Sequence, residues 1–283
     1  MTDPVEMSDG HRYWNGDGGD TWARTMDISE RNFASMTKVL MRSANAQSGE
    51  HVLDVGCGGG VTSKELAEQV LPAGKVIGLD ISDTILDIAK QRHGSVENLS
   101  FQQADVGAKP LLVTQFDLIY SRFGVMFFDE PTVAFSHLHQ ALKPDGRLVF
   151  MCWRSIKDNP WLHATTGAAV AELPEEYRPA APADPFAPGP FALADVDHTL
   201  QLLKGAGFTD VRMNKLDDFM HLGDEQTAME YLTQLGPVGS ALKKVSDEQG
   251  ESVKGAMLEV LRGYAKGDRL DVPSATWIVT AKA

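Results

Sequence analysis

The stretch that most constrains the fold is residues 51–60, which read HVLDVGCGGG. A short apolar run ends there in four glycines spread over 56–60, and a helical pattern follows over 61–67. A buried strand that enters a glycine turn and then a helix is a place where backbone can approach a ligand closely. We therefore expect the rest of the chain to support this turn or to cover whatever binds there.

Apolar runs and helical patterns alternate around this turn. Strands are predicted over 51–55, 75–79, 99–104, 116–120 and 147–153, with helices between them and a helix over 28–46 before them. Short apolar strands separated by helices indicate a parallel sheet with helices on both faces. Two further strands, over 209–219 and 275–281, complete a doubly wound α/β sheet of seven strands.

The other segments interrupt this alternation. Residues 1–30 are polar but carry Tyr13, Trp14 and Trp22, which predicts an arm that packs onto the domain. Residues 174–190 are too rich in proline for a helix interior and predict a loop or lid, whereas 224–266 have a helical pattern throughout. The predicted division is an N-terminal arm and helix at 1–47, a ligand-binding core at 48–154, a lid or substrate cover at 155–195, a core helix and strand at 196–222, a helical insertion at 223–268 and the last core strand at 269–283.

Charge and cysteine content limit which partners and which compartment we expect for this chain. The formal net charge is −13 and no cluster of Lys or Arg stands against it, so a nucleic acid partner is not expected. The only cysteines, Cys57 and Cys152, do not form a disulfide framework and suit a reducing compartment. No signal peptide is visible, and no apolar run reaches the roughly 18–20 residues of a membrane span. We predict a cytoplasmic protein without a membrane span, either a monomer or a homodimer.

Four predicted strands end in residues suited to one site. Ligands of open α/β sheets bind outside the carboxyl ends of the strands. The first strand ends in Asp54 and the glycine turn, the second in Asp80, the third in Asp105 and the fourth in Ser121. Carboxylates are acceptors for vicinal hydroxyl groups or for an ammonium group, which need acceptor-only partners. Asp80 or Asp105 taken singly could equally cap the helix or turn that follows it.

With these motifs, from Val52 to about Phe150, the sequence resembles the class I S-adenosylmethionine-dependent methyltransferases. Within that family it is similar to the group that includes the ubiquinone and menaquinone biosynthesis enzymes. The segment 142–148, LKPDGRL, matches the family's turn into the fifth strand. The resemblance implies a Rossmann-like sheet whose last strand is antiparallel, S-adenosylmethionine as the cofactor and S-adenosylhomocysteine as its product.

The resemblance also implies which residues hold the methionine part of this cofactor. Gly56, Gly58 and Gly60 would let the backbone lie against it. Asp54 would order the turn and reach the methionine ammonium group. Ser121 would contribute backbone near the same end of the cofactor.

A second set of residues would hold the nucleoside part. Asp80 would accept from the two ribose hydroxyl groups, and Ile81 would pack on the adenine ring. Asp105 would accept from the adenine amino group, and the backbone of Val106 would also bind adenine. We include Trp22 among the cofactor contacts, beside the alternative that the arm only docks on the surface.

The main competing fold assignment is a nicotinamide dinucleotide enzyme. Its fingerprint, G-x-G-x-x-G, needs a third small residue where this chain has Val61. The acid at Asp54, two residues before the first glycine, also suits a cationic ligand better than a pyrophosphate. An NAD(P)-dependent oxidoreductase is therefore disfavoured, and a second alternative is a catalytically silent protein that binds S-adenosylmethionine.

We predict methyl transfer to a small, partly apolar metabolite. Transfer from a sulfonium is an in-line displacement, which depends on positioning and on exclusion of water. His163 and His198 flank the proline-rich segment and are the predicted candidates for a general base, although a surface or packing role suits either one. No carboxylate cluster with metal-ligand spacing is evident, so no metal is predicted.

Overall fold

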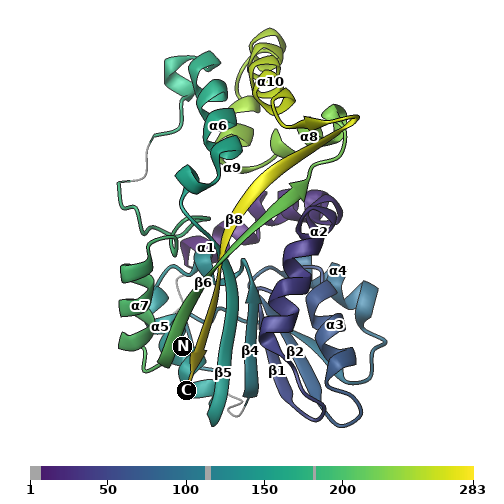
Figure 1. The fold of residues 1–283 in the computed structure, drawn as a ribbon, viewed down its shortest axis with the longest axis vertical. Coiled ribbons are helices and arrows are strands. Elements are labelled where there is room, and N and C mark those ends of the chain that lie inside the picture. Colours follow the sequence, from purple (N-terminus) through teal and green to yellow (C-terminus); the bar gives the residue numbers. More distant parts are fainter. Residues whose placement is uncertain (1–7, 112–115, 181–182) are drawn as a thin grey trace, which may run out of the picture.

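One mixed sheet forms the centre of the molecule (Figure 1). The computed structural model describes residues 8–111, 116–180 and 183–283. The strand order is β3-β2-β1-β4-β5-β8-β6, and the short β7 pairs with β8 outside this row. The strands are β1 (His51–Val55), β2 (Lys75–Asp80), β3 (Leu99–Gln103), β4 (Phe116–Arg122), β5 (Leu142–Trp153), β6 (Thr209–His221), β7 (Ala265–Lys266) and β8 (Arg269–Lys282).

The pairing confirms the predicted sheet. Strands β1 to β5 pair in parallel, and β8 is antiparallel to both of its neighbours, β5 and β6. The strand β7 is an addition that the sequence pattern did not indicate. Central residues such as Val52, Leu118 and Leu148 are completely buried because helices cover both faces of a parallel sheet.

The helices fall into two groups. Right-handed crossovers connect the parallel strands. Those that lead outward from β1 place α3 and α4 on one face of the sheet, and those that lead outward from β4 place α5 and α7 on the other face (Figure 1). The helices are α1 (Asp9–Trp14), α2 (Asp17–Ala44), α3 (Val61–Gln69), α4 (Asp83–His93), α5 (Pro131–Ala141), α6 (Pro160–Glu172), α7 (Val196–Gly205), α8 (Glu225–Leu232), α9 (Gly236–Leu242) and α10 (Asp247–Arg262), with single 3-10 turns η1 (Val125–Phe127), η2 (Ile156–Asp158) and η3 (Glu175–Tyr177).

A helical lobe stands above the sheet in Figure 1. It consists of α6, α8, α9 and α10, grouped around the far ends of β6 and β8, which run on together beyond the sheet. The predicted strands 209–219 and 275–281 were therefore too short, because both continue into this lobe. Residues 224–266 form three helices and a strand rather than one helical stretch. The break before α10 is marked by a capping box in which Ser246 and Gln249 bond each other's backbone N–H groups.

Two further expectations need correction. The helix predicted over 28–46 begins earlier, at Asp17, and α1 precedes it, so the described part of the predicted arm is helical. Gly18 and Gly19 lie in the first turn of α2, where the absence of a side chain allows close contact with α1. A Cβ at Gly19 would lie 2.0 Å from the Trp14 carbonyl oxygen. The strand predicted from residue 147 begins at Leu142. Its register against β4 shifts at residues 143–146, because Phe116 pairs with Leu142 whereas Leu118 pairs with Arg147.

No helix in the described ranges combines the length and the apolar character that crossing a membrane requires.

Candidate functional site

The glycine turn after β1 has the conformation that its sequence predicts. Gly56, Gly58 and Gly60 have φ values of 67°, 56° and 80°, a region that side chains with a Cβ rarely adopt. Gly56 also lies against the loop after β4, since a Cβ on it would be 2.7 Å from the Gly124 Cα. The ends of β1 and β4 therefore meet with a glycine on each side, which allows their backbones to approach closely.

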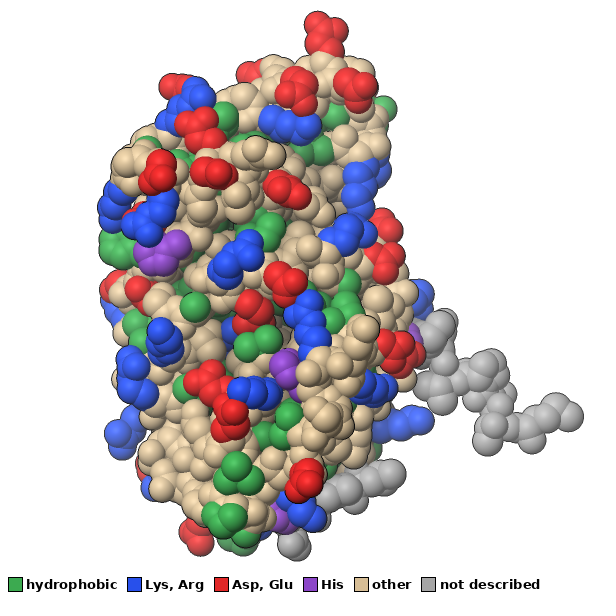
Figure 2. All heavy atoms as spheres, turned by 90° about the vertical axis from the view of Figure 1, so that its right-hand side faces the viewer, with side chains coloured by type: hydrophobic (Ala, Val, Ile, Leu, Met, Phe, Trp, Pro, Cys, Tyr) green, Lys and Arg blue, Asp and Glu red, His purple; other side chains and the backbone are tan. Residues whose placement is uncertain are grey.

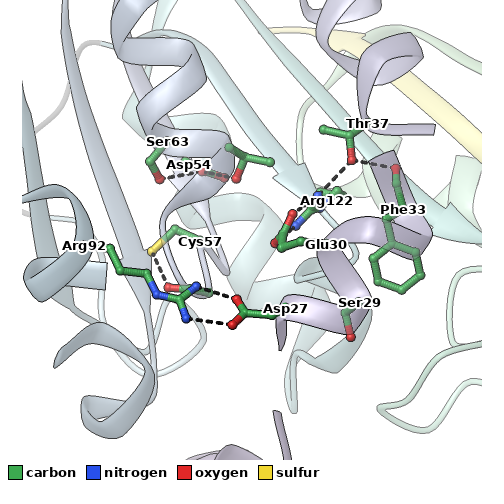
Figure 3. Close-up of polar contacts among 12 residues, drawn as sticks. Asp27, Ser29, Glu30, Phe33, Thr37, Asp54, Cys57, Ser63, Arg92 and Arg122 are labelled. Atoms are coloured by element: carbon green, nitrogen blue, oxygen red, sulfur yellow. Dashed lines mark hydrogen bonds and ion pairs between the residues drawn. The ribbon is translucent and has the colours of Figure 1, made fainter. Parts of the chain in front are cut away.

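Asp54 is a completely buried carboxylate beneath this turn. Its Oδ2 accepts from Thr62 Oγ1 at 2.7 Å and from Ser63 Oγ at 2.6 Å, both at the start of α3 (Figure 3). Its Oδ1 has no hydrogen-bond partner among the described residues. Burial raises the pKa of Asp54 to about 6, and the two hydroxyl bonds and the charge of Arg122 only partly oppose that rise. An unpaired acceptor at this position suits a cationic donor.

Asp80 organises the turn from the end of β2. Its Oδ2 accepts from Gly58 N at 3.0 Å and its Oδ1 from Ser82 N at 3.0 Å. Burial raises the pKa of Asp80, and these backbone bonds work against the rise. The cap of α4 is the Ser82 side chain, which accepts from Ile85 N. Each Asp80 oxygen retains acceptor capacity for a hydroxyl group.

Asp105 and Val106 lie at the end of β3. Asp105 Oδ1 accepts from Gly107 N at 2.9 Å and from Ala108 N at 3.2 Å, so this carboxylate does cap a turn. Asp105 Oδ2 accepts from Ser8 Oγ at 3.0 Å. The buried Val106 uses its carbonyl oxygen as an acceptor for His137 Nδ1, at 2.7 Å.

The N-terminal segment, residues 8–37, lies across these strand ends. Asn15 joins it to the loop after β2, donating to the Ile81 carbonyl oxygen at 2.9 Å and accepting from Asp83 N at 2.9 Å. The Trp22 indole nitrogen lies over the glycine turn, 3.4 Å from the position that a Cβ on Gly58 would take. The contact of Trp22 with the cofactor stays a prediction, and the structure shows its side chain next to the glycine turn.

Further contacts of the N-terminal segment were missed in the sequence. Met26 Sδ is 2.9 Å from the position of a Cβ on Gly59. Asp27 pairs with Arg92 of α4 at 2.8 Å on the same side of the turn (Figure 3). The aromatic residues in an otherwise polar segment were the only sequence signal of this cover.

The end of β4 closes the other side of the site. Ser121 Oγ donates to the Val55 carbonyl oxygen at 2.7 Å and accepts from Gly124 N at 3.2 Å, which ties β4 to β1. The next residue, Arg122, forms a buried ion pair with Glu30 of α2. No sequence signal pointed to that pair, because its members are 92 positions apart.

The two histidines proposed as bases lie on the cover segments. His163 is an exposed residue of α6. His198, in the first turn of α7, stacks on Phe186 with ring centroids 3.8 Å apart and an interplanar angle of 7°. Among the described residues, the polar and ring contacts include none that joins either histidine to Asp54, Asp80 or Asp105.

Other features of the described chain do not add a metal or a second site. No group of three His, Cys, Asp or Glu side chains is arranged there to hold a metal ion. Two hollows lie at the opposite, amino end of the strands, and one is lined by the ion pairs Lys143–Asp117 and Arg147–Glu50. On the face shown in Figure 2, acidic and basic side chains are interspersed.

Comparisons with known proteins agree with this geometry. Residues 53–150 match the family model described as "Methyltransferase domain". The chain is 34% identical over 112 residues to demethylmenaquinone methyltransferase of Staphylococcus epidermidis and 31% identical over 112 residues to that of Staphylococcus aureus. Each match covers 40% of this chain and 46% of the relative, so the chain spans about half the length of the relatives it matches.

Solved structures are similar over a larger share of the chain. A putative methyltransferase from Bacillus halodurans has a TM-score of 0.55 at 17% identity, covering 88% of this chain and 98% of its own. Haemonchus contortus phosphoethanolamine N-methyltransferase 2, solved with S-adenosyl-L-methionine, has a TM-score of 0.57 at 15% identity, covering 99% of this chain and 61% of its own. At these identities, the likeness shows a shared fold.

Proposed function

We propose that this chain is a class I S-adenosylmethionine-dependent methyltransferase that transfers the methyl group of that cofactor to a small, partly apolar acceptor. Its residues 53–150 match the methyltransferase domain model. The observation that carries the proposal is the buried Asp54 carboxylate directly before the glycine turn, whose Oδ1 has no hydrogen-bond partner among the described residues. A phosphate ligand would be repelled by this charge, whereas the methionine ammonium group would complete its hydrogen bonding.

The methionine part of the cofactor would lie along Gly56, Gly58 and Gly60, with Ser121 beside it. These glycines have left-handed backbone conformations, and Ser121 ties β4 to β1 beside them. Trp22, over Gly58, would cover this part from the N-terminal segment.

The nucleoside part would lie at the ends of β2 and β3. The remaining acceptor capacity of Asp80 suits the ribose hydroxyl groups, and Ile81 would pack on the adenine ring. Asp105 would accept from the adenine amino group, either beside the Ser8 hydroxyl or in its place. Because the Val106 carbonyl oxygen already binds His137, the backbone contribution of Val106 would be its N–H group.

Catalysis in this proposal depends on alignment of the acceptor, the methyl group and the sulfur, and on exclusion of water. Residues 8–37 and the helical lobe would supply that exclusion. The relatives' names support a quinone-type ring as the first acceptor class to test. His163 and His198 stay candidates for a general base. A cytoplasmic setting and a homodimer are part of the proposal, and the two free cysteines are compatible with the former.

Calorimetric titration tests the cofactor assignment. Wild-type protein is titrated with S-adenosylmethionine, S-adenosylhomocysteine and NAD in parallel. We expect binding of the first two, and transfer of a labelled methyl group to a compound in a metabolite extract. Binding of NAD alone would overturn the proposal, and cofactor binding without any transfer would favour a silent binding protein.

A further inference from the structure

A buried polar cluster lies where α2, β4 and α8 meet, next to the proposed cofactor site. Arg122 Nη1 donates to Glu30 Oε2 at 2.8 Å and to Thr37 Oγ1 at 2.8 Å, and its Nη2 donates to Glu30 Oε1 (Figure 3). The Arg122 side chain is 9% exposed and that of Glu30 is 20% exposed. On the α8 side, the buried Ser29 donates to Tyr231 Oη at 3.2 Å.

Hydrogen bonding in this cluster is incomplete. Arg122 Nε and one Nη2 proton have no partner among the described residues. One further polar atom in the neighbourhood, Tyr120 Oη, is buried without a partner in a residue that is completely buried. The Arg122 charge acts on both Tyr120 and Tyr231, opposing the rise in pKa that burial gives each phenol. Because buried polar atoms nearly always find partners, the unpartnered Tyr120 Oη, near the unused N–H groups of Arg122, points to a polar group that a ligand supplies.

An aromatic wall adjoins the cluster. The Arg122 guanidinium lies over the Phe33 ring, 5.9 Å from its centroid. Phe33 contacts Phe123 at 5.0 Å between centroids, and Phe123 stacks on the partly exposed Trp153 at 4.9 Å and 14°. Phe123 is held at a φ of 63°, a strained conformation for a side chain of this size. Phe33 and Phe123 are buried, so the partly exposed Trp153 is the ring of this wall that suits contact with a planar ring carrying a polar substituent.

We propose that Arg122 and Glu30 form the subsite that binds a ring hydroxyl group of the methyl acceptor. The hydroxyl donates to the Glu30 carboxylate, and the free N–H groups of Arg122 donate to its oxygen. Glu30 neutralises Arg122, so the subsite selects a neutral hydroxyl group over a carboxylate or a phosphate. This inference rests on the proposed function, because it names the recognition of the acceptor at the same site.

Two ring compounds of the same skeleton test the subsite. The protein is saturated with S-adenosylhomocysteine, and binding of reduced 1,4-dihydroxynaphthalene or of 1,4-dimethoxynaphthalene is followed by tryptophan fluorescence. Wild type should bind the dihydroxy compound more tightly. Glu30→Gln and Arg122→Lys should each weaken that binding about 10- to 100-fold, as expected for a lost hydrogen bond to a charged group. Binding of the dimethoxy compound and of S-adenosylhomocysteine should stay within about twofold.

Glu50→Gln is the matched control, because it breaks a partly buried pair of the same kind, with Arg147, at the opposite end of the strands. It should leave the preference for the dihydroxy compound unchanged. Equal binding of the two compounds by wild type would overturn the inference, as would a parallel loss of S-adenosylhomocysteine binding in the variants. Absence of S-adenosylhomocysteine binding by wild type would refute the proposed function instead. Glu30→Gln retains the shape of the side chain, so it decides the question if Arg122→Lys does not fold.

Discussion

Replacing Asp54 by Asn should make the free protein more stable while weakening its affinity for the cofactor. The folded protein holds the Asp54 pKa at about 6, whereas the ordinary value is 3.8. At about 1.36 kcal/mol per pKa unit, the charged form is disfavoured by about 3 kcal/mol in the folded state. Asn has a similar shape and no charge, and the Thr62 and Ser63 hydroxyl groups can rotate to bond its amide.

The sign of the pH dependence follows from the raised pKa. Above pH 6 the carboxylate is ionised in both the folded and unfolded states, so its full burial penalty lowers the free energy of unfolding. As pH falls from 6 toward 4, the folded state binds a proton first and the penalty disappears. Asp54→Asn should therefore be more stable than wild type by up to about 3 kcal/mol at pH 7.5. That difference should shrink as the pH is lowered through this window.

Urea unfolding of the free protein at pH 7.5, 6 and 4.5 measures the stability, and calorimetry at pH 7.5 measures binding of S-adenosylhomocysteine. Loss of a charged hydrogen bond to the ligand ammonium should cost about 1.5–3 kcal/mol, or roughly 10- to 100-fold in affinity. Asp210→Asn, at an exposed carboxylate near the start of β6, is the control. A variant less stable than wild type at pH 7.5, or one with unchanged affinity, would refute this reasoning.

Three further predictions concern the same site. Gly124→Ala should abolish S-adenosylhomocysteine binding in calorimetry, because its Cβ would lie 2.7 Å from the Val55 carbonyl oxygen. Gly255→Ala in α10, where a Cβ meets nothing within 4 Å, should leave binding unchanged, and equal effects of the two changes would contradict the geometry. Asp80→Ala should weaken binding by about 1.5–3 kcal/mol, and unchanged affinity would show that the carboxylate only orders the turn. Asn15→Ala should accelerate dissociation of S-adenosylhomocysteine in stopped flow and hydrogen exchange over 9–22, since it removes both bonds to the loop after β2. An unchanged dissociation rate would show that the N-terminal segment does not retain the cofactor.

The sequence was informative where structure follows from local patterns. Strands β1, β2 and β4 are short apolar runs because the parallel sheet buries both of their faces. The acids Asp54 and Asp80 were recognisable because each follows or lies within such a run, at the end where ligands bind. The aromatic residues of the N-terminal segment indicated that it packs onto the domain, but they did not show that Trp22 lies next to the glycine turn.

Features that depend on contacts distant in sequence were not predictable. The start of α2 is rich in Gly and Asp, which disfavour helices, and it is helical because it packs onto α1 and the strand ends. The Arg122–Glu30 pair joins residues 92 positions apart, so neither residue stands out in its own neighbourhood. Helix α6 lies in the segment predicted only as cover, and it packs against α10, a helix distant in sequence.

A crystal structure with bound S-adenosylhomocysteine tests the central claim most directly. The account predicts a nucleoside across the carboxyl ends of β2 and β3, with the ribose hydroxyl groups on Asp80. It also predicts the methionine ammonium group within hydrogen-bond distance of Asp54 Oδ1, beneath Trp22. A ligand bound elsewhere, or one that leaves Asp54 Oδ1 unpaired, would contradict it.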